Sequence, residues 1–304
     1  MDKLNSLTIF TRAAQTRNFA LAAQQLGISP STVSKAVSRL EERLGTRLLQ
    51  RTTRSITLTD DGTRFYNRCC QILEDIEEAE SELNRAQSHP FGTLRIGMVP
   101  SFARIHVMPA LPEFAERYPD VNLELFLSDR YVDLIEEGFD GVVRVGKSPD
   151  SNFAMQSLAS ARLVVCASPN YFSRYGVPQT PEDLLHHNCI NYVVPQTGRI
   201  REWTFQNGKK RLQLPVNGRF CIDNAEASVE AAIAGTGIIQ LYNFVVGQAI
   251  NQGQLVPILS NYAPAKVPIS LIYAQKRYLC AKGQVFIEFL QKLIAQLKRE
   301  RIVE

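Results

Sequence analysis

Residues 19–45 read FALAAQQLGISPSTVSKAVSRLEERLG, and this stretch decides the fold of the N-terminal part of the chain. Its apolar spacing predicts a first helix over residues 19–26, and Gly27 marks the end of that helix. Ser29 as a cap and Pro30 at the first helical position predict the start of a second helix. Two helices joined by so short a connection are typical of a helix-turn-helix.

The second helix has one apolar and one polar face. Val33, Val37, Leu40 and Leu44 recur at steps of four, three and four, which predicts the face that packs inward. A reading helix in the major groove of double-stranded DNA needs small hydroxyl side chains and cations on its outer face. The candidates for DNA contact are Ser29, Pro30, Ser31, Thr32, Ser34, Lys35 and Arg39. The alternative is the solvated face of an ordinary helical hairpin.

Both flanks of this pair favour DNA binding. Residues 4–14 have helical apolar spacing, and residues 48–59 read as a short hairpin, which resembles the wing of a winged helix-turn-helix. The tip of that hairpin carries side chains suited to phosphate oxygens, namely Arg51, Thr52, Thr53 and Arg54. Residues 1–58 hold nine Lys or Arg against three Asp or Glu, whereas residues 59–88 hold three against eight. We therefore expect a DNA-binding domain over residues 1–59.

A long helix is predicted next, over residues 60–88, with Thr59 as its cap. Its apolar residues recur every seven positions: Phe65, Cys69, Ile72, Ile76, Ala79, Leu83 and Ala86. Such a repeat is typical of a two-stranded coiled coil, so we expect this linker helix to join two chains. The alternative is a single long helix that lies on its own domain.

Beyond Gly92 the pattern alternates between strands and helices, which predicts α/β structure with a mainly parallel sheet. Residues 102–117 are predicted to be helical with breaks near Pro109 and Pro112, and residues 133–137 to form a short helix. Two α/β lobes with a cleft between them would place a ligand at the carboxyl ends of their strands.

Several function classes find no support in the residues. The chain has 304 residues, 45% of them hydrophobic and 21% charged, which is typical of a globular protein. Its N-terminus fits neither a secretory signal nor a transit peptide, so we expect a cytoplasmic protein with no membrane span. The six cysteines have no metal-ligand spacing, and no enzyme motif such as GxSxG or a phosphate-binding loop occurs. We expect no enzyme activity, no metal and no cofactor.

The order of these parts resembles that of the LysR-type transcriptional regulators over the whole chain. The residues that carry the resemblance are 19–23, 26–29, 33–35, 40–45 and 51–54, together with Leu58, Thr59 and Gly62. The chain departs from the family at Ser29-Pro30-Ser31, where relatives often have Ser-Gln-Pro, so one base-reading amide is missing.

The resemblance implies a two-lobed, periplasmic-binding-protein-like effector domain over residues 92–304. Lobe one would comprise residues 92–162 and 268–304, and lobe two residues 163–267. It also implies a homodimer or a dimer-of-dimers tetramer, and a small-molecule effector, often an organic acid. Residues carried over to the effector cleft are Pro100, Ser101, Phe102, Ser128, Arg144 and Asn224. A plain helix cap is the alternative for Ser101 and Asn224, and a structural ion pair for Arg144. Two other classes remain, namely a binding-protein-like enzyme or solute carrier with an added helical module, and a DNA-packaging protein without a ligand.

Overall fold

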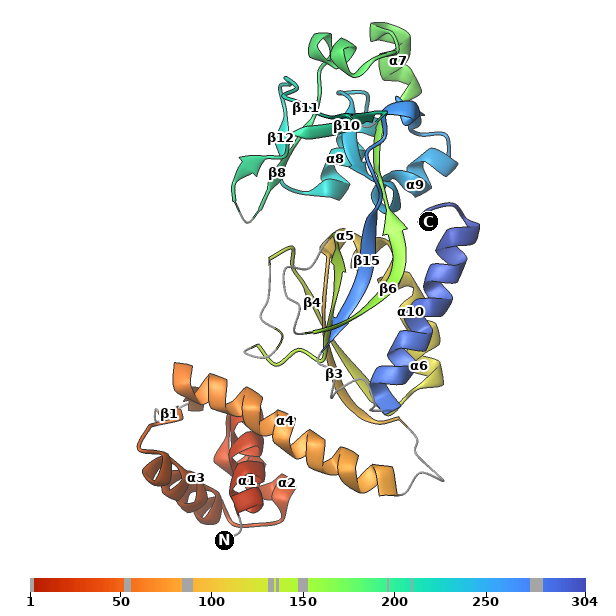
Figure 1. The fold of residues 1–304 in the computed structure, drawn as a ribbon. Helices are drawn as coiled ribbons and strands as arrows, with labels where there is room; N and C mark the ends of the chain where they lie inside the picture. Colours follow the sequence, from red (N-terminus) through yellow and green to blue (C-terminus); the bar gives the residue numbers. More distant parts are fainter. Residues whose placement is uncertain are drawn as a thin grey trace. The chain divides into compact units, whose positions relative to one another are not determined.

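The computed structural model describes residues 3–51, 56–83, 90–130, 134, 137–146, 153–195, 197–208, 210–273 and 281–304. The chain divides into two compact units, residues 1–89 with 133–138, and residues 90–132 with 139–304. The first unit is helical with one hairpin, and the second is α/β (Figure 1). The predicted fold class, a winged helix-turn-helix with a long helix and a two-lobed α/β part, is confirmed.

The first unit begins with three helices packed around one core. They are α1 (Lys3–Thr16), α2 (Phe19–Leu26) and α3 (Pro30–Leu44). Asn18 caps α2, Ser29 caps α3, and Gly27 and Gly45 end the two helices in the left-handed conformation, with φ of 65° and 67°. The core contains Val33, Val37 and Leu40 of α3 with Ile9, Phe10, Leu48 and Leu49. Leu44, which was also predicted to face inward, is 42% exposed, so that part of the prediction is wrong. Local capping signals therefore set the ends of the helices, as predicted.

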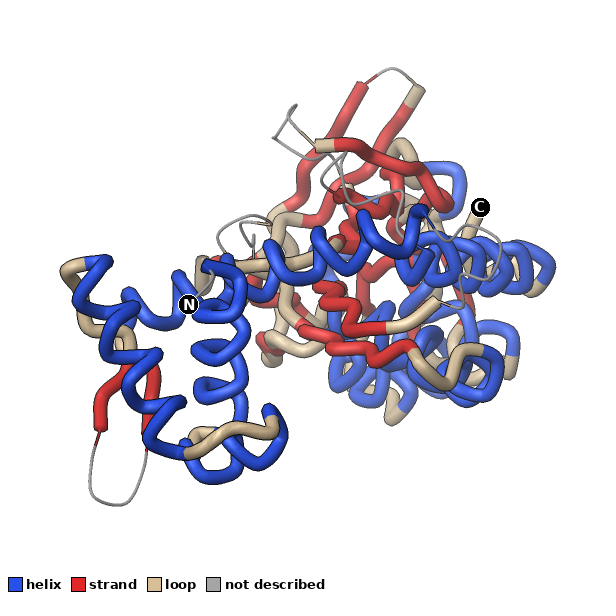
Figure 2. Tube along the Cα trace, turned by 90° about the horizontal axis from the view of Figure 1, so that it is seen from below, coloured by secondary structure: helices blue, strands red, loops and turns tan. Residues whose placement is uncertain are grey.

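A close approach of two backbones fixes how the hairpin meets the long helix. Strands β1 (Leu49–Arg51) and β2 (Ile56–Leu58) pair antiparallel, side by side in Figure 2, and α4 (Asp60–Leu83) follows. The Thr59 hydroxyl donates to Arg47 O (2.8 Å) and accepts from Gly62 N–H (2.9 Å). A Cβ on Gly62 would lie 1.9 Å from Leu48 O, so no other residue fits there.

The second unit contains a five-stranded sheet in the order β4-β3-β5-β15-β6. β3 runs parallel to β4 and β5, whereas β15 runs antiparallel to β5 and β6. The elements of this part are β3 (Gly92–Met98), α5 (Pro100–Phe102), the π-helix η1 (Ala103–Val107), α6 (Met108–Arg117), β4 (Val121–Leu127), β5 (Gly141–Val145), β6 (Ala154–Ala161), β15 (Val267–Tyr273) and α10 (Ala281–Arg299).

The rest of this unit contains three smaller sheets, in the orders β13-β7-β14, β12-β8-β9 and β10-β11, which we call together the second sheet. β7 lies between β13 and β14, antiparallel to both, and a parallel bridge between Cys189 and Ile238 links this group to β8 and its neighbours. The elements are β7 (Leu163–Ala167), α7 (Pro169–Tyr175), η2 (Pro181–His186), β8 (Asn191–Val194), β9 (Arg199–Ile200), β10 (Trp203–Asn207), β11 (Lys210–Leu214), β12 (Cys221–Ile222), α8 (Ala225–Ile233), β13 (Ile239–Tyr242), α9 (Asn243–Asn251), β14 (Val256–Ile258) and η3 (Ser260–Tyr262).

The structure differs from two predictions made for residues 92–304, and a third falls mostly on residues that it does not describe. The expected mainly parallel sheet is wrong, because the long strands β6 and β15 enter the five-stranded sheet as an antiparallel pair. The helix after β3 is not broken at the prolines: helical residues continue from Pro100 to Arg117, and the irregular turn is the π-helix η1 just before Pro109. Most of the helix predicted over residues 133–137 lies outside the described residues.

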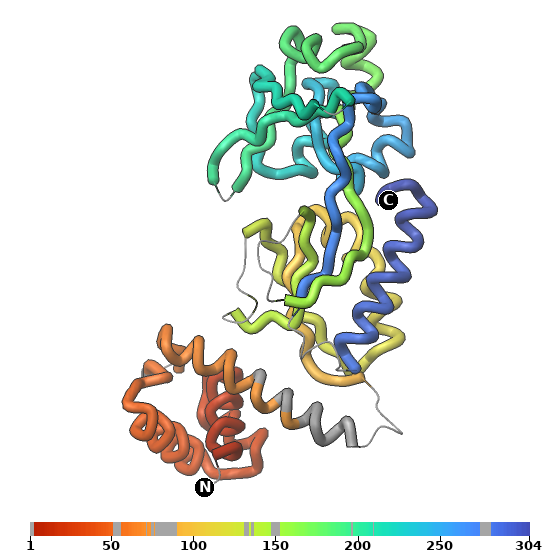
Figure 3. Tube along the Cα trace, in the orientation of Figure 1, coloured from red at the N-terminus to blue at the C-terminus, as the bar shows by residue number. Residues whose placement is uncertain are grey.

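The two sheets are joined where strands cross from one to the other. Arg162 alone separates β6 from β7, and β15 returns beside β6 (Figure 3). Asn243 binds Arg162 twice: its N–H donates to Arg162 O (2.9 Å), and its Oδ1 accepts from Arg162 N–H (3.1 Å). Ser160 and Glu304 exchange two further backbone hydrogen bonds, of 2.7 and 3.0 Å. We call residues 160–163 with Asn243 the strand crossing.

Candidate functional site

The outer face of α3 is the first candidate site. Ser31, Lys35 and Arg39 lie four residues apart and are exposed or half-buried, whereas Val33 and Val37 on the opposite face are buried. Among the described residues, the side chains of Lys35 and Arg39 have no hydrogen bond or ion pair. Their charges are therefore available to a partner that approaches this face.

The start of α3 carries the other predicted contacts. The Ser29 Oγ accepts from Thr32 N–H (3.2 Å) and lies 2.9 Å from Ser31 Oγ and 2.8 Å from Thr32 Oγ1. Pro30 is exposed, and Ser34 is partly buried. These hydroxyl groups form one cluster at the N-terminus of the helix, where backbone N–H groups favour an anionic oxygen.

Sequence reasoning missed a residue that positions the hairpin. The Glu41 Oε1, on α3, accepts hydrogen bonds from Leu48 N–H (2.8 Å) and Leu49 N–H (3.0 Å). A side chain of α3 therefore holds the start of β1 directly. At the tip, Thr52, Thr53 and Arg54 lie outside the described residues, and Arg51 is the last residue of β1.

The apolar repeat of α4 begins in the core of the first unit and continues onto an exposed surface. Phe65 packs against Phe10 with ring centroids 5.5 Å apart, and Cys69 is buried in the core of the first unit. These first two positions of the predicted seam are therefore wrong as contacts between two chains, because they cover the helix-turn-helix of their own chain. Ile72, further along, is 38% exposed.

The second candidate site is a cleft of about 810 Å³ in the second unit, which we call the ligand cleft. One wall comes from the carboxyl ends of β3, β4 and β5, and the other from β8 and the starts of α8 and α9. Its lining residues include Pro100, Ser101, Ser128, Asp129, Arg130, Arg144, Tyr192, Arg201, Asp223, Asn224, Glu226, Tyr242 and Phe244. The ends of parallel strands and the starts of helices are where α/β folds commonly bind ligands.

Five of the six predicted effector residues line this cleft, and Phe102 does not. Phe102 is fully buried and packs edge-to-face on Phe244 at 5.7 Å, so its predicted place in the cleft is wrong: its side chain turns into the core. Asn224 caps α8 by accepting from Ala227 N–H (2.9 Å). Ser128 accepts from Arg130 N–H at 3.2 Å, and Ser101 lies in the first turn of α5.

Arg144 is already engaged by the protein. Its guanidinium donates to Asp129 O (3.5 Å) and Arg130 O (2.5 Å), and so holds the loop after β4. Burial raises the pKa of the Asp129 carboxyl, while the charge of Arg144 acts in the opposite direction. Arg144 therefore supports one wall of the cleft as well as lining it.

Arg201 is the cation that sequence reasoning missed. Its guanidinium donates to Gln240 O (2.7 Å) and lies 5.1 Å and 5.7 Å from the ring centroids of Tyr192 and Tyr242. Burial lowers its pKa from the usual value, and no carboxylate pairs with it among the described residues. Between two rings, with N–H groups left over, this arginine is arranged to receive an anion. No local sequence motif indicates the role of Arg201, because Tyr242 lies far along the chain and only the fold brings the two residues together.

Two contacts join the walls of the cleft. Arg104, on η1, forms an ion pair with Glu226 of α8 at 3.4 Å. His106, also on η1, is buried, and its Nε2 atom lies 2.7 Å from Phe244 O. Burial lowers the pKa of His106, which favours the neutral ring.

In the part of the chain that the structure describes, no helix is long and apolar enough to cross a membrane. No group of three or more His, Cys, Asp or Glu side chains is placed to hold a metal ion among those same residues.

Two family models match the chain. A model described as a bacterial regulatory helix-turn-helix protein of the lysR family matches residues 4–63. A model described as the LysR substrate binding domain matches residues 87–295. The first covers the helix-turn-helix with its wing, and the second covers both sheets.

Relatives match over nearly the whole chain. An HTH-type transcriptional regulator of Haemophilus influenzae is 36% identical over 282 residues, 93% of this chain and 97% of the relative. The structure of CrgA, a LysR-type transcriptional regulator from Neisseria meningitidis, has a TM-score of 0.63 at 30% identity and covers 97% of this chain and 99% of that chain. The structure of the Vibrio cholerae virulence activator AphB has a TM-score of 0.60 at 26% identity, with 96% and 99% covered. These relatives are transcription regulators, not enzymes.

The buried His106 gives a testable pH dependence. Its folded-state pKa lies below the unfolded value of about 6.5, so the unfolded chain binds more protons as the pH falls through that value. The free energy of unfolding should therefore fall between about pH 7.5 and 5.5, by at most about 1.4 kcal/mol per pH unit from this group. Urea unfolding of His106→Gln, which keeps a donor for Phe244 O but does not titrate, should show a smaller loss. His186→Gln is the control, and equal losses in wild type and His106→Gln would contradict the assignment.

Proposed function

The chain belongs to the LysR family of bacterial transcriptional regulators, and from that premise we propose that it binds a DNA operator as a homodimer or a dimer of dimers, under control of a small organic anion. We assign DNA binding to residues 1–59, chain association to residues 60–88, and effector binding to residues 92–304. In this proposal the protein works in the cytoplasm, where the DNA is.

The unpaired cations on α3 carry the DNA-binding half of the proposal. Lys35 lies one turn after the hydroxyl cluster of Ser29, Ser31 and Thr32, where it reaches base edges, and Arg39 lies one turn further, toward the phosphates. The wing tip at residues 51–54 adds contacts to the backbone of the DNA.

The ligand half of the proposal is carried by Arg201. A half-buried arginine without a carboxylate partner among the described residues is unusual, because its charge is costly to hold partly away from water. A carboxylate in the ligand cleft would accept its remaining N–H groups, with further contacts from Ser101, Ser128 and Asn224. The rings of Tyr192 and Tyr242 would pack on the body of the same ligand.

The outer end of α4 supports association of two chains. Ile72 is exposed on the chain alone, and the seven-residue spacing continues to Ile76, Ala79 and Leu83. Two paired α4 helices would cover these apolar side chains and place two reading helices on a partly palindromic site.

The effector must act through differential affinity. A ligand moves an equilibrium between two arrangements only if it binds one of them more tightly. The Arg104–Glu226 ion pair joins the two walls, so it is a contact that opening of the cleft would break. Closure around an anion would thus change how the dimers lie on DNA.

The DNA-binding face can be tested in binding titrations on operator DNA. Lys35→Ala should weaken specific binding by about 1–3 kcal/mol and relax base preference at one position. Arg39→Ala should weaken binding to all sequences alike and lower the salt slope by about one. Lys298→Ala, on α10, is the control for loss of one positive charge. Full affinity and base preference in Lys35→Ala would contradict this assignment.

Sedimentation velocity tests the role of α4. Ile72→Lys places a charge in the proposed seam and should weaken chain association at least about tenfold, which is about 1.4 kcal/mol. Thr63→Lys adds the same charge to an exposed position of the same helix and should leave association unchanged. If Ile72→Lys sediments as wild type does at every concentration, α4 does not join the chains.

A thermal-shift screen of small mono- and dicarboxylates tests the ligand cleft. A carboxylate present at 100 times its Kd should stabilise the protein by about 2.7 kcal/mol. Arg201→Gln should abolish this stabilisation, because it removes the charge but keeps a polar side chain that can donate a hydrogen bond. Arg199→Gln, exposed on β9, is the matched control. Equal stabilisation of Arg201→Gln and wild type by the same acid would place the anion elsewhere.

A further inference from the structure

A second cavity, of about 140 Å³, lies against β7, β13 and α9, and it shares no lining residue with the ligand cleft. Part of its lining is apolar and comes from the second sheet and from α9, namely Leu163, Val164, Val165, Phe205, Ile250, Pro257 and Ile258. Another part is polar and comprises Arg162, Gln240, Asn243, Asn251, Ser260 and Arg301. Val165 and Phe205 are buried. An apolar cavity of roughly 150 Å³ is large enough to hold a benzene ring.

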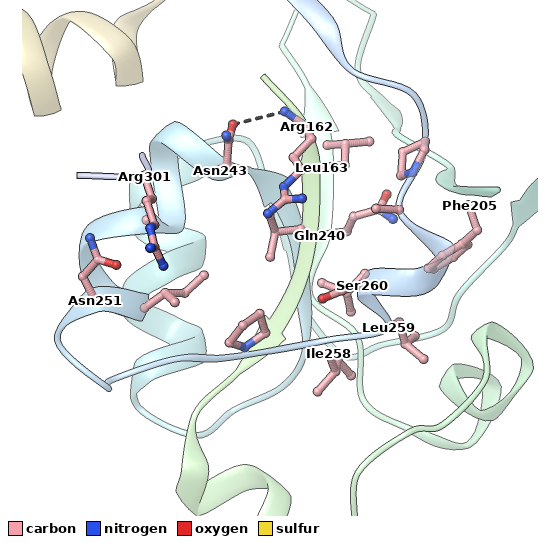
Figure 4. Close-up of a pocket in the computed structure, with 17 residues that line it drawn as sticks. Arg162, Leu163, Phe205, Gln240, Asn243, Asn251, Ile258, Leu259, Ser260 and Arg301 are labelled. Atoms are coloured by element: carbon pink, nitrogen blue, oxygen red, sulfur yellow. Dashed lines mark hydrogen bonds between the residues drawn. The ribbon is translucent and has the colours of Figure 1, made fainter. Parts of the chain in front are cut away.

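Two arginines lie at this cavity. Figure 4 shows Arg301 and Asn251 on one side, Ile258 and Leu259 on the opposite side, and Arg162 between them. The Arg162 Nε binds Glu304 Oε1 at 3.0 Å, and Lys266 binds the other oxygen of the same carboxylate. The Arg301 guanidinium has no hydrogen bond or ion pair with any described residue. The rim therefore has more positive than negative charge.

The backbone at this cavity is strained. Three non-glycine residues among those described have positive φ, and two of them, Leu259 (54°) and Arg301 (58°), line this cavity. Arg301 follows the last turn of α10, donating from its N–H to Lys298 O at 3.0 Å, in the conformation for which glycine is preferred at helix ends. An arginine there costs stability, and such residues cluster at functional sites.

We propose that this cavity is a second ligand site, which takes a small monocarboxylate with a flat apolar body. The apolar body would fill the space against Phe205 and Val164, and the carboxylate would accept a two-pronged hydrogen bond from Arg301. The exposed charge without a partner, the strained backbone that presents it and the apolar side chains on one part of the lining all fit this one ligand class. This proposal does not depend on the anion proposed for the ligand cleft, because the two sites share no lining residue.

One structural element faces both sites. Asn243, the first residue of α9, lines the second cavity and binds Arg162 at the strand crossing. Its neighbours Tyr242 and Phe244 line the ligand cleft. An occupant of the second cavity thus contacts the turn that forms one wall of the cleft.

Fluorine NMR titration of the full-length protein with para-fluorobenzoate tests the proposal. Wild type should give saturable broadening or a shift of the probe, with a Kd on the order of 1 mM or tighter. Arg301→Gln should weaken binding about tenfold or more, the value of one charge-assisted hydrogen bond. Ala263→Phe, which fills the cavity from the loop after η3, should abolish it. Arg301→Gly should also lose binding while it unfolds at a higher temperature, because glycine suits the left-handed backbone.

The control variants distinguish binding in the second cavity from binding in the ligand cleft. Arg299→Gln, which removes a nearby exposed charge, should bind the probe as wild type does. Arg201→Gln, which removes the cation of the ligand cleft, should keep the binding that Arg301→Gln and Ala263→Phe lose. Loss of binding in Arg201→Gln with retention in Arg301→Gln and Ala263→Phe would overturn the second site. Equal binding of the neutral para-fluorobenzamide would overturn the anion assignment, and no saturable binding to wild type would overturn both.

Discussion

The strand crossing is the constraint on which the ligand-binding unit depends. A single residue, Arg162, lies between a strand of one sheet and a strand of the other, and Asn243 holds its backbone on both sides. The two walls of the ligand cleft are thus held together at this point by backbone hydrogen bonds. Phe102, Phe244 and His106 fill the space beside it. A connection so short has few backbone angles that can change.

The two arginines of the cleft, Arg144 and Arg201, carry the same charge but make different contacts. Arg144 donates to two carbonyl oxygens and thereby shapes a loop. Arg201 has one carbonyl partner and two aromatic rings, which hold its plane but leave N–H groups unused. Because guanidinium stays charged even when it is partly buried, the second arrangement keeps one positive charge with unused N–H groups at the wall of the cleft.

Sequence predicted what local chemistry decides and missed what tertiary packing decides. Gly27 ends α2 in the left-handed conformation and the side chain of Ser29 caps the start of α3, so capping rules sufficed for these two ends. The repeat in α4 identified an apolar stripe but not what covers it, and the same chain covers Phe65. The family resemblance assigned both Ser101 and Phe102 to the cleft; Ser101 lines it, whereas the side chain of Phe102 is buried in the core. Arg201 acquires its role only from residues far along the chain.

The arrangement of α3 has an evolutionary consequence. Its inward residues and Glu41 maintain the fold, while the side chains of Lys35 and Arg39 bind no polar partner within the described chain. Substitutions at surface positions without partners usually change stability by less than about 0.5 kcal/mol. If these side chains contact DNA as proposed, duplicated copies of such a gene can acquire new operators by drift at these positions, without first gaining stability to tolerate the change. A lineage of regulators diversifies most easily where recognition and folding use different side chains of one helix.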